Sequence, residues 1–165
     1  MSTGRTWKFG DNVDTDAMAP GAYMKFGIEQ IAAHCLESLR PEFAAQVRPG
    51  DIVIGGRNFG VGSSREQAPQ ALRHLGVAAV VAVSYAGLFY RNALNLGLPV
   101  VVCAEAPTID DAVTAQVDFE AGRIELPAAQ RIFACEPIPR FLLEMLNDGG
   151  LLPHLARRLK ARSAS

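Results

Sequence analysis

A glycine-rich segment, Gly55–Glu66, carries the side chains best suited to chemistry. Three glycines, two serines and an arginine follow one another closely in it: Gly56, Gly60, Gly62, Ser63, Ser64 and Arg65. Glycines allow positive φ angles and close approach to a ligand, and a helix starting at the serines would offer unpaired N–H groups to an anion. Arg65 adds a planar cation suited to a carboxylate or phosphate. The segment therefore predicts an anion-binding turn.

Two nucleotide-binding signatures and one structural pattern compete with this interpretation. A P-loop requires a lysine that the stretch Gly56–Ser63 lacks, and a dinucleotide fingerprint requires Gly-x-Gly-x-x-Gly, whereas this loop has Gly-x-x-x-Gly-x-Gly. Ser63 and Glu66 have the spacing of a helix capping box, which would explain these two residues but neither the glycines nor Arg65. A free-standing nucleotide-binding α/β domain is kept as an alternative, testable by binding of ATP or NAD.

Hydrophobic patterns predict the elements that position this loop. Strands are expected at 6–10, 51–54, 77–83 and 98–103, and helices at 28–39, 64–75 and 87–96. Alternation of strands and helices favours a parallel α/β core, and the apolar run at 77–83 is typical of a strand covered on both faces. After Pro107, short antiparallel strands are expected at 116–120, 123–126 and 131–134, followed by helices at 141–146 and 151–162.

Length and composition limit the classes of protein that this chain can form. The 165 residues suffice for one domain, 1–165. A net charge of −1 gives no reason to expect nucleic acid as a partner. The longest apolar run, Val77–Val83, is far shorter than the ~20 residues that cross a bilayer, and the first residues lack a signal-peptide pattern. We therefore expect no membrane association and a cytoplasmic location.

Neither the cysteines nor the histidines have the spacing of a metal site. Cys35, Cys103 and Cys135 are far apart and form no Cys-x-x-Cys pair, so they build neither a zinc knuckle nor an iron–sulfur ligand set. The histidines at positions 34, 74 and 154 are equally isolated. We expect no metal bound by this chain.

Several segments in order resemble one family. They are Gly10–Asp16, Arg57–Glu66, Leu72–Gly76, Ser84–Asn95 and Gly97–Val100. Together they are similar to the aconitase swivel domain and to isopropylmalate isomerase small subunits, over about the first two thirds of the chain. The resemblance implies a three-layer β/β/α swivelling domain with a parallel core sheet and small antiparallel strands. It also implies a hydro-lyase whose 4Fe-4S cluster lies on a separate large subunit, in a heterodimer or heterotetramer.

The resemblance implies roles for particular residues. Ser63 would be the catalytic base that removes a proton next to a substrate carboxylate, and Asp16 would support the site from the opposite loop. Ser64 and Arg65 would bind substrate carboxylate oxygens. We expect Arg57 and Asn58 to brace the loop, together with Gly60 and Gly62.

The substrate is expected to be a 2-hydroxy di- or tricarboxylate, with 3-isopropylmalate, converted to 2-isopropylmalate in leucine biosynthesis, as the leading interpretation. By the same resemblance, the loop after the aspartate motif sets specificity. Isopropylmalate isomerases commonly have Tyr-Leu followed by an apolar or varied residue there, and homoaconitases have arginine at the third position. The segment Tyr23-Met-Lys25 departs from both patterns. Lys25 could bind a distal carboxylate or pack its stem on Tyr23 as a surface cation. Other candidate substrates are homoaconitate, methylmalate or citraconate, and dimethylmalate. An alternative of another class is a non-catalytic anion- or RNA-binding regulatory module.

Overall fold

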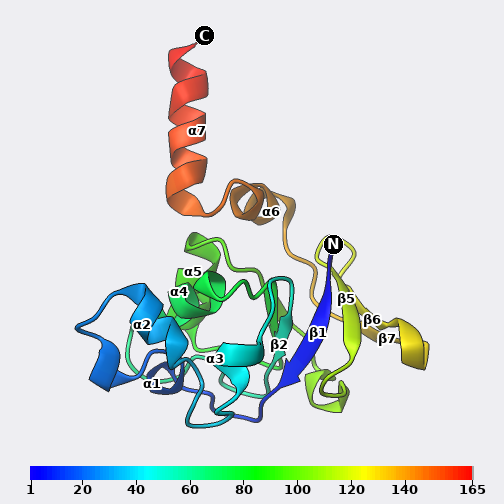
Figure 1. Ribbon diagram of the computed structural model, residues 1–165. Coiled ribbons are helices and arrows are strands. Elements are labelled where there is room, and N and C mark those ends of the chain that lie inside the picture. The colour runs from blue at the N-terminus through cyan, green and yellow to red at the C-terminus, as the bar shows by residue number, and fades with distance from the viewer. Residues whose placement is uncertain (165) are drawn as a thin grey trace.

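In the computed structural model, which describes residues 1–164, the strands form one mixed sheet in the order β4-β3-β2-β1-β5-β6-β7 (Figure 1). Their bounds are β1 Ser2–Lys8, β2 Ile52–Ile54, β3 Ala79–Ala82, β4 Val100–Val102, β5 Thr114–Asp118, β6 Arg123–Leu126 and β7 Arg131–Ala134. Strands β1 to β4 pair in parallel, whereas β5, β6 and β7 continue the sheet in antiparallel pairs from the other side of β1. The predicted parallel core with small antiparallel strands is confirmed.

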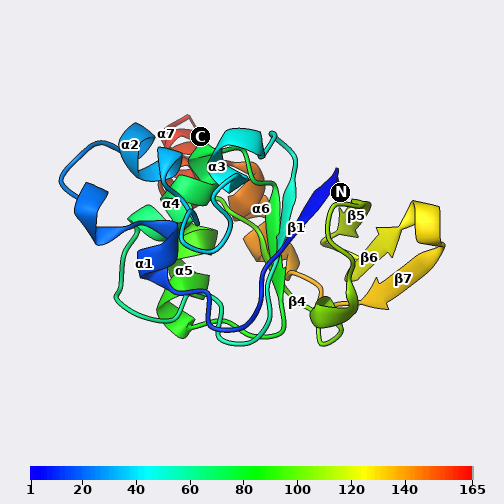
Figure 2. The same ribbon diagram turned by 60° about the horizontal axis from the view of Figure 1, so that its bottom comes forward.

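The parallel strands are buried on both faces, as their uninterrupted apolar sequences predict. Because successive side chains point to opposite faces of a sheet, Val53 and Val80 join the core beneath the helices. Ile54 and Val81 join a second core shared with the antiparallel strands. Helices, parallel strands and antiparallel strands therefore form the three layers of the predicted β/β/α domain (Figure 2).

The two edges of the sheet meet at one end. The amide of Glu136, just after β7, donates to the carbonyl oxygen of Val102 in β4 at 2.9 Å. The thiol of Cys103 donates to the carbonyl oxygen of Ala134 at 3.5 Å. These contacts tie the antiparallel half to the parallel half, so that both enclose the second core.

Helices cover the outer face of the parallel strands and form the C-terminal end of the chain. Their bounds are α1 Thr15–Met18, α2 Ile28–Ala33, α3 Phe43–Gln46, α4 Gln67–His74, α5 Gly87–Asn95, α6 Arg140–Asn147 and α7 Leu151–Ser163. The predicted helix 28–39 ends at Ala33. Leu36 has a left-handed φ of 60°, and its amide donates to the carbonyl oxygen of Ala17 at 2.7 Å. This tertiary hydrogen bond takes the place of the bond that the Leu36 amide would make within a continued helix.

The helix predicted from Ser64 begins instead at Gln67, and the capping box does not form. Glu66 occupies the N-cap position in helical conformation, without a side-chain cap hydrogen bond. At the other end Gly76 follows with a φ of 87°, the C′ geometry that the sequence predicts. The serines therefore lie in the loop before α4 and not on its first turn.

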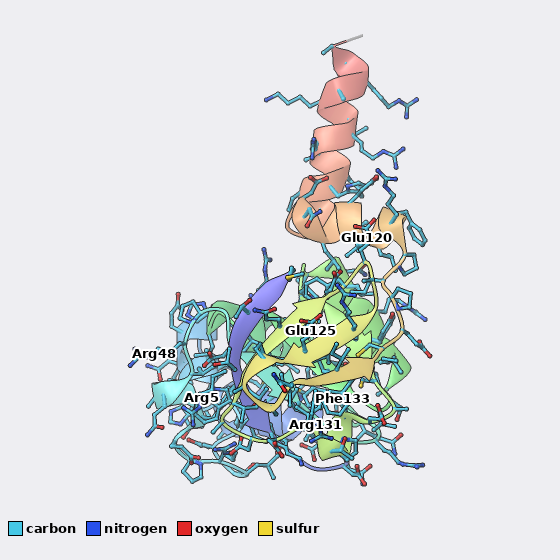
Figure 3. The ribbon with its side chains drawn as sticks, turned by 90° about the vertical axis from the view of Figure 1, so that its right-hand side faces the viewer. Arg5, Arg48, Glu120, Glu125, Arg131 and Phe133 are labelled. Atoms are coloured by element: carbon cyan, nitrogen blue, oxygen red, sulfur yellow. The ribbon has the colours of Figure 1, made fainter. Side chains whose placement is uncertain are left out.

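Helix α7 projects from the rest of the chain (Figure 1). None of its residues is buried, and its side chains extend into open space on several sides (Figure 3). At its base, Asp148 accepts hydrogen bonds from His154 at 2.7 Å and from Arg157. No helix among residues 1–164 is both long and apolar enough to cross a membrane.

Candidate active site

The loops that follow β1, β2 and β3 are joined at the carboxyl end of the parallel strands. The amide of Gly60 donates to the carbonyl oxygen of Val13 at 2.7 Å. The amide of Phe59 donates to the carbonyl oxygen of Ser84 at 3.0 Å. The glycine-rich loop is therefore held between its two neighbours, at the edge of a parallel sheet where α/β proteins bind ligands.

Glycines are required in this loop for two different reasons. Gly60 and Gly62 have φ angles of 84° and 114°, and a Cβ at Gly60 would lie 2.1 Å from the Phe89 ring. Gly56 does not have a positive φ, contrary to the prediction. A Cβ there would lie 1.9 Å from the carboxylate of Asp11, so close packing and not conformation requires Gly56.

Asn58 and Arg57 contact the neighbouring loops. Asn58 has a left-handed φ of 56°, its amide donates to Ser84 Oγ at 2.9 Å, and its side-chain amide donates to Asn12 Oδ1 at 3.2 Å. The backbone amide of Arg57 donates to Asp11 Oδ1 at 2.8 Å. The Asn58 side chain and the Arg57 backbone therefore fix the path of the loop, while the Arg57 side chain is exposed.

Ser63 and Ser64 face an open hollow of about 150 Å³. Both are exposed, and within residues 1–164 neither hydroxyl has a hydrogen-bond partner. The opposite wall is the first turn of α5, including Gly87 and Leu88. N–H groups in a first turn lack intrahelical partners and attract negative charge. The helix N-terminus beside the serines thus belongs to α5, and not to the helix that follows them in sequence.

Arg65 is held in place by Asp16 and by a backbone carbonyl group. Its Nη1 donates to Asp16 Oδ1 at 2.9 Å and to the carbonyl oxygen of Ala19 at 2.8 Å. Two hydrogen bonds lower the pKa of Asp16 below its ordinary value of 3.8: the larger effect comes from the Arg65 side chain and the smaller from the Gly21 amide. The Asp16 side chain is 68% exposed and that of Arg65 24%. Asp16 itself does not line the serine hollow.

Tyr23 and Lys25 lie outside the serine hollow. The Tyr23 ring stacks on His34, with centroids 3.7 Å apart. Lys25 Nζ lies 5.3 Å from the centroid of the Phe26 ring. The ammonium group of Lys25 therefore lies in cation–π range of Phe26. The structure places Ser63, Ser64 and Arg65 around one hollow, with Asp16 bound to Arg65. Tyr23 and Lys25 do not line that hollow.

The first turn of α5 is the part of the site for which the sequence analysis assigned no role. Its residues fall within the stretch Ser84–Asn95 that resembles the family, which was the available signal. Neither a repeated pattern nor a charged side chain distinguishes them. Only the tertiary structure brings this turn opposite Ser63.

The side chains that the structure describes form no ligand set for an iron–sulfur cluster. Within residues 1–164, no group of three or more His, Cys, Asp or Glu side chains is placed to hold a metal ion. Cys35 packs in the core beneath the helices, whereas Cys103 and Cys135 pack in the second core. None of the three lines the serine hollow.

Fold and site together define the class of α/β domain found at the C-terminus of aconitases. A profile of the aconitase C-terminal domain matches residues 42–105. A crystal structure of 3-isopropylmalate dehydratase from Methanocaldococcus jannaschii has a TM-score of 0.92 and 37% sequence identity, covering 98% of this chain and 97% of that chain.

Two curated relatives are similar over nearly their whole length. The 3-isopropylmalate dehydratase small subunit of Syntrophus aciditrophicus is 49% identical over 158 residues, covering 94% of this chain and 96% of the relative. The methanogen homoaconitase small subunit of Methanothermobacter thermautotrophicus is 48% identical over 157 residues, covering 94% and 91%. This chain belongs to the small-subunit family of 3-isopropylmalate dehydratase, a hydro-lyase of the aconitase type.

Proposed function

We propose that this chain is the small subunit of a hydro-lyase that converts 3-isopropylmalate to 2-isopropylmalate in leucine biosynthesis, and that residues 1–165 act as a single swivel domain. The observation that carries the proposal is the open hollow in which two serine hydroxyls, without a hydrogen-bond partner among residues 1–164, lie beside a fixed arginine. Such a hollow offers one proton acceptor and several donors to a hydroxy acid. The reaction removes water from the substrate and adds it back with the hydroxyl on the neighbouring carbon.

Ser63 is the proposed base. It takes the proton from the carbon next to a carboxylate while water leaves the adjacent carbon, and the proton and water then return to exchanged carbons. A serine is a weak base in water, so its alkoxide form needs nearby positive charge. Arg65 and the first turn of α5 are the groups that supply it around the hollow.

Ser64 and Arg65 are the residues proposed to bind a substrate carboxylate. Since Nη1 of Arg65 is occupied by Asp16 and Ala19, the remaining N–H groups of the guanidinium are left for the ligand. Asp16 thereby positions Arg65 without touching the substrate. A planar group fixed in this way suits a bidentate contact that lysine does not reproduce.

A large subunit completes the site. The serine hollow, at about 150 Å³, is smaller than the roughly 300 Å³ at the lower limit of ligand sites, which supports a second chain that supplies the remaining walls. We propose that this partner carries the 4Fe-4S cluster, which when bound activates the hydroxyl that leaves. The complex is a heterodimer or heterotetramer in the cytoplasm.

Substrate identity depends on the loop Pro20–Gly27. Arg65 donates to the carbonyl oxygen of Ala19, the residue just before this loop, so the loop begins beside the proposed carboxylate-binding side chain. Lys25 is exposed there and could bind a distal carboxylate. The similarity to a homoaconitase small subunit favours homoaconitate as the second candidate, ahead of methylmalate or citraconate and dimethylmalate. Assay of the assembled enzyme on this panel distinguishes them.

Replacement of Ser63 by alanine tests the proposal. We expect the purified chain alone to be inactive, and activity to appear when it is mixed anaerobically with its large subunit. Ser63→Ala should abolish this activity without lowering the melting temperature, because the hydroxyl has no partner within the described chain. Ser38→Ala, outside the loop, is the matched control. Full activity of Ser63→Ala would contradict the assignment, and salt-dependent RNA binding without dehydratase activity would favour the regulatory module.

A further inference from the structure

Two cysteines lie side by side where the two edges of the sheet meet. Cys103 follows β4 and Cys135 follows β7, at a contact that we call the β4–β7 junction (Figure 2). The Cys103 thiol donates to the carbonyl oxygen of Ala134, the residue before Cys135, at 3.5 Å. The amide of Glu136, the residue after Cys135, donates to the carbonyl oxygen of Val102, the residue before Cys103, at 2.9 Å. Contacts on both sides of Cys135 therefore hold it against Cys103.

The spacing of the two backbone segments suits a disulfide bond. Segments joined by backbone hydrogen bonds lie about 4.8 Å apart in a sheet, and the Cα atoms of bonded cysteines lie about 4.4–6.8 Å apart. The two thiols are already close enough for a hydrogen bond between them. Both are free thiols, so the structure is that of the reduced form.

The surroundings of Cys103 favour its thiolate form. Its pKa falls from the ordinary value of 9.0 to about 7. The hydrogen bond from the Cys135 thiol is the largest cause, hydrogen bonds from the Glu105 and Ala106 amides act in the same direction, and burial opposes them. The same contact raises the pKa of Cys135, which keeps its proton. Because the thiolate is the nucleophilic form of cysteine, Cys103 is the member of the pair that reacts first.

Cys35 shows the effect of burial on a thiol that has no such neighbour. It is fully buried in the core beneath the helices, and burial alone raises its pKa. Cys135 is partly exposed, so a small reagent has access to the β4–β7 junction on that side. Cys35 is therefore an unreactive reference within the same chain.

The pair lacks the further ligands that a metal ion requires. Within residues 1–164, no third His, Cys, Asp or Glu side chain joins the two thiols to hold a metal ion. Structural zinc sites take four protein ligands. Two adjacent thiols without other ligands fit a disulfide instead.

We propose that Cys103 and Cys135 form a reversible disulfide on exposure to a peroxide, and that this bond locks the β4–β7 junction. The Cys103 thiolate attacks one oxygen of hydrogen peroxide, the O–O bond breaks, and the sulfur becomes a sulfenic acid while hydroxide leaves. The hydroxide takes up the proton that Cys103 released. The Cys135 sulfur then attacks the sulfenic sulfur, the S–O bond breaks, and the Cys135 proton leaves with that oxygen as water. The pair is oxidised by two electrons, and the peroxide is reduced to water.

The disulfide would stabilise the sheet without changing the serine hollow, because neither cysteine lines that hollow. It would close a loop from Cys103 to Cys135 that contains β5, β6 and β7. Closure of a loop of about 30 residues restricts the unfolded chain. We therefore expect the oxidised chain to melt about 5–15 °C above the reduced chain.

Oxidation of the purified full-length chain with hydrogen peroxide tests the proposal. Trypsin cleaves after Arg123 and Arg131, which lie between the two cysteines, so the disulfide joins peptides 92–123 and 132–140. Mass spectrometry without reductant should detect this linked pair, and dithiothreitol should separate it and reverse the rise in melting temperature. The rate of linkage should increase as the pH rises through the Cys103 pKa of about 7, because the thiolate is populated above that pH.

Cysteine variants identify the role of each thiol. Cys35→Ala is the matched control and should be linked as fast as the wild type. Cys135→Ser, whose hydroxyl keeps a hydrogen-bond donor beside Cys103, should stop at the sulfenic acid, which dimedone labels. Cys103→Ser should give neither the linked peptides nor the label. Each variant should have the circular dichroism of the wild type.

The wild-type peptide map decides the proposal even where a variant fails to fold. Absence of the linked pair after peroxide treatment would overturn it, and so would a disulfide that involves Cys35 or joins two chains. An unchanged or lower melting temperature of the linked chain would contradict the stabilising role of the bond.

Discussion

Replacement of Arg65 by lysine should have a small effect on the free energy of unfolding and a large effect on the rate of catalysis. The hydrogen bond to the Ala19 carbonyl oxygen is worth about 1 kcal/mol. The pair with Asp16, whose side chain is 68% exposed, contributes less than about 1 kcal/mol after screening, and a lysine retains part of it. We therefore expect the free energy of unfolding to fall by about 1 kcal/mol, a decrease of about 2–4 °C in melting temperature.

The effect on catalysis should be much larger. Loss of a bidentate contact to a carboxylate in the transition state costs about 2–4 kcal/mol, which corresponds to a decrease in kcat/KM of roughly 30- to 1,000-fold. The assay is dehydration of the substrate by the complex with the large subunit, alongside calorimetry of the small subunit alone. Arg73→Lys, on the exposed side of α4, is the control for a generic arginine replacement. A kcat/KM within threefold of wild type, roughly 0.65 kcal/mol, would refute the role of Arg65, and a loss of stability above about 3 kcal/mol would refute the energetic reasoning.

Three further outcomes can be measured on the small subunit. Gly60→Ala should be destabilised by at least about 2 kcal/mol in chemical unfolding, because its φ is 84° and the new Cβ would meet the Phe89 ring. Asp51→Ala should cost about 2–4 kcal/mol, since it leaves the buried Trp7 indole N–H without its acceptor at 2.9 Å; unchanged unfolding would contradict this. Hydrogen bonds from the base of α7 lower the pKa of Asp148, so the stability they add is present above its ordinary value of 3.8 and is lost as the pH falls through the lowered pKa. Amide exchange in α7 should accelerate over that acidic range, and a rate that follows wild type in Asp148→Asn would contradict the assignment.

Local sequence was sufficient to predict the parallel core and the position of the glycine-rich loop. The run Val77–Val83 has the composition of a strand covered on both faces, and β3 lies there with every residue buried. Gly76 ends the preceding helix as its sequence predicts. In these places the local preference and the tertiary structure require the same conformation.

The prediction was wrong where distant contacts decide the backbone. Leu36 leaves the helical pattern because its amide bonds to Ala17, and no local signal reports that bond. Ser63 and Glu66 have capping-box spacing, yet Arg65 between them is drawn to Asp16, 49 positions away in sequence. The first turn of α5 was missed for the same reason, since only the sheet topology brings it to the serines.

The central position of β1 has a consequence for how the chain folds during synthesis. This strand is made first, but β2 follows it by about 45 positions and β5 by more than 100. The Thr6 hydroxyl bonds to the carbonyl oxygen of Asp110 at 2.7 Å, and the Val113 amide donates to the same hydroxyl at 3.1 Å. Until that region leaves the ribosome, one edge of β1 has no partner and is open to other chains. Completion of the sheet must therefore await the synthesis of β5, β6 and β7, more than 100 residues after β1, which predicts slow folding and a dependence on chaperones during translation.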